Sequence, residues 1–185
     1  MPLYSSLFEP IRFNPVLILE LGFAKGRGAR CLLEYFPKGN VHSADFDLEA
    51  SLHYADNMLP SYRARLTIHQ FDQGRTDDYG RMLGAIDSGN NQANFDIIID
   101  DCSHNPDHQM LSFVKLWPRT TPGGYYVIED MHPYYQNGRH PTVEYFANKI
   151  HELNKLGQYK NDPTLDWQWV NFSPNRIILR KNNVY

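Results

Sequence analysis

The amino-acid sequence predicts an α/β fold, with a seven-stranded, mostly parallel sheet, helices on both of its faces and an antiparallel pair of strands at the C-terminal end. Three observations support this prediction. Short apolar runs alternate with amphipathic segments of about ten residues, as in parallel strands joined by right-handed helical crossovers. The first apolar run passes through a glycine-rich turn into a helix. The last two extended runs are separated by Ser-Pro-Asn, which is a hairpin signal.

The parallel part of the sheet is predicted from five apolar runs that are too short to be anything but buried strands. Between them, apolar residues recur three or four positions apart, and proline or glycine ends several of these helical segments. We expect strands at 15–22, 41–47, 66–71, 95–99 and 125–128, with helices at 29–36, 48–58, 77–86 and 107–116.

The C-terminal part has a different order of elements. A helix is expected at 141–156, because Val143, Phe146, Ile150 and Leu153 fall on one face. The hairpin strands are expected at 167–172 and 176–180. The chain of 185 residues fits one compact domain, residues 1–185, without internal repeats.

Composition and charge disfavour several classes of partner. The net charge of −3 offers no general attraction for nucleic acid or for acidic membranes, so we expect neither as a partner. No apolar run approaches the roughly 18 residues of a membrane span, and the N-terminus lacks the pattern of a leader peptide. Cys31 and Cys102 show no disulfide or zinc spacing. We therefore expect a cytoplasmic protein.

Two of the predicted strands end abruptly in acidic residues. The sequence FDIIIDDCSH begins at Phe95, and PGGYYVIED ends at Asp130. Because ligands bind at the carboxyl edge of an open parallel sheet, these ends predict a site that combines a metal with a base. Individually, each acid could instead cap a helix or face solvent. The side chains expected together are Asp100, Asp101, His104, Glu129 and Asp130.

The glycine-rich turn, Glu20-Leu-Gly-Phe-Ala-Lys-Gly-Arg-Gly28, lets a ligand approach the backbone where the first strand enters its helix. Its G-x-x-x-G-x-G spacing differs from the dinucleotide-binding pattern. Asp45, at the end of the next strand, could accept hydrogen bonds from both hydroxyls of a ribose. Together the two features favour a nucleoside ligand over the alternatives, a purely structural turn and a helix cap.

The motifs ELGFAKGRG, ADFD, FDQ, FDIIIDD and PGGYYVIED, with the terminal antiparallel pair, resemble the class I S-adenosylmethionine-dependent methyltransferases, whose fold is Rossmann-like. More narrowly, FDIIIDDCSHNPDHQ with PGGYYVIED is similar to the metal-dependent macrolide sugar O-methyltransferases of the mycinamicin and demethylmacrocin type, and to their cephalosporin-hydroxylase-like relatives. The similarity extends from about Val16 to Lys181.

The resemblance implies roles for individual residues of this chain. Glycines would wrap the methionine end of S-adenosyl-L-methionine, acids would bind its ribose or a divalent metal, and a histidine would act as general base. The implied cofactor residues are Glu20, Gly22, Gly26, Gly28, Asp45 for the ribose, Asp72 and Gln73 against the adenine, and Asp100. The implied metal ligands are Asp101, Glu129 and Asp130, and the implied base is His104.

These roles are chemically consistent with one another. Carboxylate oxygens suit Mg²⁺, and a metal-bound hydroxyl loses its proton more easily to a histidine. The implied activity is a Mg²⁺-assisted O-methylation of a hydroxyl on a sugar or another small natural product. The oligomeric state is left open and includes a homo-oligomer. Two alternatives remain: a degenerate, non-catalytic binding protein and a hydroxylase-like relative.

Three features qualify the resemblance. Cys102 stands where the family usually has glycine, which would strain the loop if that position needs positive φ, and its thiol could favour zinc. His108 and His132 are alternative bases. Because the first strand begins after about fifteen residues, we expect the lid over the acceptor to come from Met131 to His140, with Tyr134 and Tyr135 stacking on the acceptor.

Overall fold

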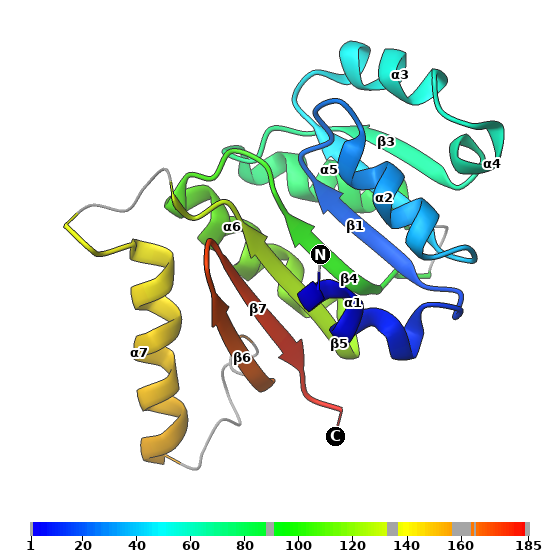
Figure 1. Ribbon diagram of the computed structural model, residues 1–185. Coiled ribbons are helices and arrows are strands. Elements are labelled where there is room, and N and C mark those ends of the chain that lie inside the picture. The colour runs from blue at the N-terminus through cyan, green and yellow to red at the C-terminus, as the bar shows by residue number, and fades with distance from the viewer. Residues whose placement is uncertain (1, 88–90, 133–136, 157–163, 165, 184–185) are drawn as a thin grey trace.

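The computed structural model describes residues 2–87, 91–132, 137–156, 164 and 166–183. A seven-stranded sheet in the order β3-β2-β1-β4-β5-β7-β6 forms its centre (Figure 1). Neighbours from β3 to β5 are parallel, whereas β7 is antiparallel to both β5 and β6. The predicted fold class is confirmed. The strands are β1 (Leu17–Leu21), β2 (Asn40–Asp45), β3 (Leu66–Gln70), β4 (Phe95–Asp100), β5 (Thr120–Glu129), β6 (Trp167–Ser173) and β7 (Arg176–Lys181).

Helices cover both faces of the sheet, because successive residues of each buried strand point to opposite sides. In β1, Ile18 enters one hydrophobic cluster with residues of α1, α2 and α3, and Leu19 enters the other with residues of α5, α6 and α7. The α-helices are α1 (Pro2–Phe8), α2 (Arg27–Tyr35), α3 (Leu48–Asp56), α4 (Pro60–Arg63), α5 (Thr76–Ile86), α6 (Pro106–Leu116) and α7 (Pro141–Leu156), with 3₁₀ turns η1 (Glu9–Ile11) and η2 (Trp117–Arg119).

Side-chain caps start two of the helices that follow the site strands. The Asp47 carboxylate accepts a hydrogen bond from the Ala50 amide, 3.0 Å away, at the start of α3. Asn105 does the same for the Asp107 amide at the start of α6, and Pro106 occupies the first turn, where no amide hydrogen is needed. These caps end β2 and β4 sharply and leave their acidic ends at the sheet edge.

Three details differ from the expectations. Strand β5 begins at Thr120 and runs through Pro122-Gly-Gly, beside a register shift in its pairing with β4. The N-terminal residues form α1, and a short α4 follows α3. Helix α1 depends on tertiary contacts, since Phe8 packs against the rings of Phe36 and Tyr125. A helix this short carries little signal in its own sequence.

The length and polarity of the helices bear on membrane insertion. Across the described parts of the chain, none of the helices has a stretch apolar and long enough to pass through a bilayer.

Candidate active site

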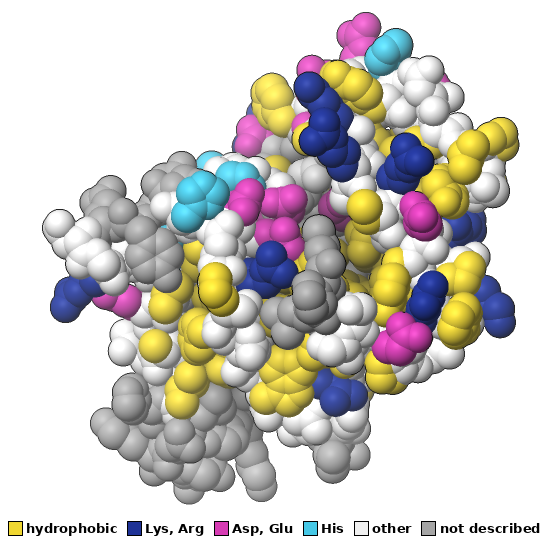
Figure 2. All heavy atoms as spheres, in the orientation of Figure 1, with side chains coloured by type: hydrophobic (Ala, Val, Ile, Leu, Met, Phe, Trp, Pro, Cys, Tyr) yellow, Lys and Arg dark blue, Asp and Glu magenta, His cyan; other side chains and the backbone are white. Residues whose placement is uncertain are grey.

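The carboxyl ends of the five parallel strands meet at one edge of the sheet. Leu21 of β1 pairs with Ala44 of β2 and with Asp100 of β4, and Asp100 pairs with Ile128 of β5, so these strands end at the same level. In Figure 2, acidic side chains gather beside histidine side chains on this side of the molecule. The register therefore brings the predicted cofactor and metal residues to a common edge.

The glycine turn after β1 is shaped by close backbone approaches. Gly22 has φ +94°, and a Cβ there would overlap the carbonyl oxygen of Asp101. A Cβ on Gly28 would overlap the carboxylate of Glu20. Gly26, with φ +69°, begins α2 as its N-cap. An added Cβ would thus meet other atoms of the chain at all three positions, and those atoms belong to the backbone at Gly22. The cofactor contacts of all three glycines stay predictions.

Glu20 is a buried carboxyl at the base of this turn. Burial raises its pKa to about 8, although the Ser43 hydroxyl donates a 2.6 Å hydrogen bond to it. Nearby Asp101 and Asp45 raise the pKa further. The side chain is therefore largely protonated near neutral pH, and a carboxylic acid can donate a hydrogen bond as well as accept one.

Asp45 holds the glycine turn in place. One of its oxygens accepts a hydrogen bond from the Ala24 amide at 2.8 Å, and the other accepts one from the Asp47 amide at 3.1 Å. Ala24 has φ 47°, in the left-handed region. Asp45 thus holds the glycine turn, whereas the cap of α3 is Asp47 and not Asp45, and Asp45 still presents free lone pairs at the sheet edge.

A hollow of about 510 Å³ adjoins Asp45, at the start of α3. Phe46, directly after Asp45, is 70% exposed on its rim. An exposed aromatic ring beside an acid that is predicted to bind a ribose can stack on a planar base. Phe46 was not among the residues predicted from the sequence, although its position immediately after a strand-end acid is a signal. The hollow is lined by Phe46, Asp47, Leu48, Glu49, Leu52 and Gln70.

Asp72 and Gln73, which follow β3 and Phe71, face different ways. Asp72 lies near the surface, where its carboxylate accepts a hydrogen bond from the Gly74 amide at 3.0 Å. Gln73 is buried, and its side-chain amide is bonded to Asp100 and to Ser103. Contacts of both residues with adenine stay predictions. Asp100 itself is fully buried, and this burial raises its pKa to about 7.

Asp101, His104 and Asp130 come together beyond the ends of β4 and β5. One ligand atom of each lies within 4.8 Å of the others. His104 has φ 60° and Asp130 has φ 54°, which are left-handed values for non-glycine residues. Such backbone strain concentrates at functional sites, because it persists only where the surroundings enforce it.

This group fits a divalent cation by its donor chemistry. Burial raises the pKa of Asp101, and the neighbouring charge of Asp130 raises it further. A bound cation would relieve that repulsion, and two carboxylates with an imidazole are suitable ligands for one. The Nδ1 atom of His104 is buried with no hydrogen-bond partner among the described residues. The residues present therefore fit a metal ion.

Glu129, the third predicted metal ligand, points elsewhere. The hydroxyl of Tyr4 in α1 donates a hydrogen bond to its carboxylate. The Arg176 guanidinium lies 5.1 Å from the centre of the Tyr4 ring. Burial raises the pKa of Glu129, and Arg176 opposes this rise. The structure thus brings together Asp101 and Asp130 and places Glu129 against the N-terminal helix, a contact that no sequence pattern signalled.

Asn175, in the turn between β6 and β7, is a supporting residue that the sequence analysis did not assign to the site. Its side-chain amide donates a 2.6 Å hydrogen bond to Asp130. Its side-chain oxygen, Oδ1, accepts one from the backbone amide of His132 at 2.7 Å. The ring of His132 contacts the same oxygen, at 3.0 Å. Asn175 therefore orients Asp130 and forms a hydrogen bond with the ring of His132, one of the alternative bases.

Cys102 does not strain the loop that follows β4. Cys102 is absent from the positive-φ residues, so cysteine causes no such strain at that position. Burial raises its thiol pKa to about 12, which disfavours the thiolate that zinc would need.

In the expected lid, Met131 and His140 are buried, whereas Tyr134 and Tyr135 lie outside the described residues.

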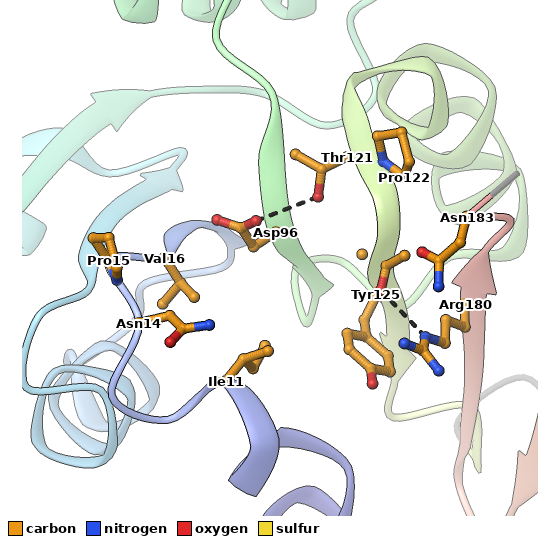
Figure 3. A pocket seen from close by; sticks show the side chains of 12 residues that line it. Ile11, Asn14, Pro15, Val16, Asp96, Thr121, Pro122, Tyr125, Arg180 and Asn183 are labelled. Atoms are coloured by element: carbon orange, nitrogen blue, oxygen red, sulfur yellow. Dashed lines mark hydrogen bonds between the residues drawn. The ribbon is translucent and has the colours of Figure 1, made fainter. Parts of the chain in front are cut away.

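A separate pocket of about 410 Å³ lies at the opposite edge of the sheet, where β4 and β5 begin (Figure 3). Asp96 accepts a 3.3 Å hydrogen bond there from the Thr121 hydroxyl, and Arg180 donates one to the Gly123 carbonyl oxygen. It contains none of the predicted site residues. The hollow beside Asp45 is therefore the one that adjoins the predicted site.

The chain is similar in sequence to known O-methyltransferases. The chain is 34% identical over 137 residues to 8-demethyl-8-(2-methoxy-α-L-rhamnosyl)-tetracenomycin-C 3′-O-methyltransferase of Streptomyces olivaceus, covering 70% of this chain and 31% of that protein. It is 31% identical over 144 residues to mycinamicin VI 2″-O-methyltransferase of Micromonospora griseorubida, covering 74% and 32%. The chain thus matches about a third of the length of these relatives.

Solved structures share the fold. The MycE methyltransferase of the mycinamycin biosynthetic pathway, in complex with Mg, SAH and mycinamycin VI, superposes with a TM-score of 0.77 at 24% identity, over 98% of this chain and 48% of that one. The O-methyltransferase TomG from Streptomyces achromogenes, in complex with SAM, has a TM-score of 0.61 at 17% identity, over 99% and 80%.

The family assignment comes from a sequence profile described as a methyltransferase domain, which matches residues 19–131. This segment runs from β1 to the residue after Asp130, so it contains the glycine turn, Asp45 and the Asp101–His104–Asp130 group. The match covers more than half of the chain. The chain therefore belongs to the methyltransferase domain family.

Proposed function

We propose that this chain is an S-adenosyl-L-methionine-dependent O-methyltransferase that uses a divalent metal, Mg²⁺ by preference, to methylate a hydroxyl on a sugar of a small natural product. The observation that carries the proposal is the Asp101–His104–Asp130 group. This group lies next to the glycine turn, because the backbone of Asp101 packs against Gly22. The names of the sugar O-methyltransferases that the chain resembles support the acceptor class.

The cofactor is proposed to lie along the edge from the glycine turn to the hollow beside Asp45. Asp45 would accept the ribose hydroxyls, and Phe46 would contact the adenine. Protonated Glu20, beneath Gly28, supports the turn that faces the methionine end. Methyl transfer depends mainly on holding donor and acceptor close, so the rigid turn supplies much of the catalysis.

Asp101 and Asp130 are the proposed metal ligands. Glu129 stays a prediction as a third ligand, because Tyr4 holds its carboxylate in this structure. When bound, the metal would lower the pKa of an acceptor hydroxyl. His104 would remove the proton from that hydroxyl as general base, and Asp130, with an oxygen 3.9 Å from its Nε2, would stabilise the imidazolium that forms.

We also propose that residues 1–185 form one domain and that the protein works in the cytoplasm. The first proposal is supported by the single sheet that links β1 to β7. The second is supported by the two cysteines, which are both free thiols. The acceptor is proposed to be a small molecule, without a nucleic acid partner, and a homo-oligomer remains open.

The test is methyl transfer from radiolabelled S-adenosylmethionine to a panel of glycosylated macrolides and polyketides, with Mg²⁺ or with EDTA. We expect product only with Mg²⁺. Calorimetry with S-adenosylhomocysteine measures cofactor binding separately. Failure to bind that compound contradicts the proposal at its base, whereas binding without transfer to any acceptor supports a non-catalytic protein. Turnover that survives both EDTA and Asp101→Ala contradicts the metal.

A further inference from the structure

We propose that Gln73 is a positioning residue, which holds the loop 101–105 in the conformation that places His104 beside Asp101. The inference rests on the proposed function, because the loop matters through the site that it carries. It assigns Gln73 a task in the protein interior, distinct from the adenine contact expected from the family resemblance.

Gln73 is 3% exposed, and all four hydrogen-bonding positions of its side-chain amide are occupied. Its Oε1 atom accepts hydrogen bonds from the Ser103 amide at 2.9 Å and from the Ser103 hydroxyl at 2.7 Å. Its Nε2 atom donates to Asp100 at 2.7 Å and to the Ser112 hydroxyl at 2.9 Å. A primary amide has two donor hydrogens and two acceptor lone pairs, so none is left for a ligand.

The orientation of the amide is determined by its partners. A backbone N–H can only donate, so the atom that faces the Ser103 amide is the oxygen. The nitrogen then faces Asp100, whose carboxylate oxygen accepts the bond. No other side chain of this length offers two acceptor lone pairs on one side and two donors on the other. Glutamate, the closest in shape, lacks the donors.

Tyr79 of α5 and Ser112 of α6 also form hydrogen bonds with Gln73. The Tyr79 hydroxyl of α5 donates to the backbone oxygen of Gln73 at 2.9 Å, so its lone pair accepts from Ser112 of α6, 2.8 Å away. Each of these groups is buried and hydrogen-bonded to its neighbours, so the network restrains Gln73. Gln73 is therefore a fixed point against which the loop can be held.

The loop is anchored on both sides of the strained residue. Before it, the Asp101 amide donates to the Leu21 oxygen at 3.0 Å. After Ser103, Asn105 caps α6. His104 lies between these anchors with φ 60°. A histidine with a left-handed backbone is strained and persists only under such constraint. The bonds of Ser103 to Gln73 supply the constraint nearest to it.

The same bonds orient the ring of His108. Since the Ser103 hydroxyl donates its hydrogen to Gln73, its oxygen accepts from Nδ1–H of His108, 2.9 Å away. Nε2 of His108 is directed over Gly74, where a Cβ would meet it at 2.9 Å, and among the described residues His108 is not part of the group formed by Asp101, His104 and Asp130. This leaves His104 as the histidine at the acidic group.

The decisive experiment measures Mn²⁺ affinity by electron paramagnetic resonance, without acceptor, in Gln73→Glu and Gln73→Leu. Gln73→Leu releases Ser103, whereas Gln73→Glu keeps an acceptor oxygen for Ser103 but sets a second carboxyl group against Asp100. We expect Mn²⁺ affinity to fall roughly 10–100-fold, as for other groups that support metal ligands. Affinity for S-adenosylhomocysteine should stay close to that of the wild type. Gln92→Glu, at an exposed loop residue, makes the same charge change and should alter neither.

Amide hydrogen exchange at Ser103 gives a readout independent of the metal, and it should accelerate in Gln73→Leu. If both Gln73 variants unfold, Ser103→Ala removes the hydroxyl contacts to Gln73, His108 and Asn105 while keeping the amide bond to Gln73, and it should weaken Mn²⁺ binding severalfold. Unchanged Mn²⁺ affinity in folded variants overturns this inference alone. A wild-type protein that binds no Mn²⁺ overturns the metal proposal together with it. Lost S-adenosylhomocysteine binding with normal Mn²⁺ affinity establishes the adenine contact instead.

Discussion

The Nε2 atom of His104 lies 3.9 Å from an oxygen of Asp130, and both residues have left-handed backbones, with φ values of 60° and 54°. Asparagine, aspartate and histidine tolerate this conformation better than most residues, yet it still carries strain. The two strained residues lie beyond the ends of the neighbouring strands β4 and β5, and Asn175 donates a hydrogen bond to Asp130. The backbone strain therefore lowers the stability of the fold at the point where the carboxylates and the imidazole meet.

Replacement of His104 separates strain from chemistry. His104→Gly removes the proposed base and also relieves the left-handed strain, so we expect turnover to fall at least about 100-fold while the free energy of unfolding rises by about 1 kcal/mol. His104→Ala should lose the same activity without that gain. Urea unfolding and methyl-transfer rates measure the two effects. His53→Ala, at an exposed residue of α3, is the control. Near-normal turnover in both His104 variants would move the role of base to another residue.

Asn175→Gly tests the support of Asp130. Glycine accepts the φ of 65° at this turn, so the change removes the side chain without straining the backbone. With the 2.6 Å bond to Asp130 lost, we expect Mn²⁺ affinity to fall roughly tenfold, with little change in melting temperature. Calorimetric metal titration measures this. Asn94→Gly, in an exposed loop, should leave the affinity unchanged, and an equal loss in both variants would argue against a specific role.

Two glycines differ in how much a methyl group costs. Gly22→Ala would force a Cβ into the Asp101 carbonyl at φ +94°, so we expect a loss of stability on the order of 3 kcal/mol. Gly84, in α5, has no atom within 4 Å of an added Cβ, and Gly84→Ala should stabilise the protein by up to about 1 kcal/mol. Chemical denaturation compares them, and similar values for the two would contradict the packing described at Gly22.

Burial of Glu20 makes stability depend on pH. Its pKa is about 8 in the folded protein and about 4.5 when unfolded, so the folded state binds the proton more tightly. The free energy of unfolding should therefore fall as pH rises from 4.5 to 8. Glu20→Gln lacks this titration, and at pH 7 we expect it to be more stable than wild type by on the order of 3 kcal/mol, with the difference vanishing toward low pH.

Urea unfolding at several pH values measures the difference between the wild type and Glu20→Gln. Asp100 titrates in both proteins, so its contribution cancels in that difference. The exposed Glu34→Gln in α2 is the matched control and should follow the wild type. Parallel curves for the wild type and Glu20→Gln would show that the Glu20 carboxyl is ionised in the folded protein.

Local patterns in the sequence determined the fold class and the edge at which the acids gather. Strand-length apolar runs, helical spacing and the turn residues each act over a few positions, which is why β4, α6 and the C-terminal hairpin follow the expected order. Helix α1 and the extended start of β5 did not follow from such signals, since Phe8 and Thr120 owe their conformations to partners far away in the chain.

The sequence by itself determined which residue types would reach the sheet edge, because strand period and parallel topology place every strand end there. Only the tertiary structure decided how they divide: Asp101 and Asp130 meet His104, Glu129 meets Tyr4, and Gln73 turns inward. It also placed the left-handed residue at His104, with Cys102 unstrained. Hydrogen-bond partners and backbone constraints of this kind join segments distant in sequence, and no local pattern encodes them.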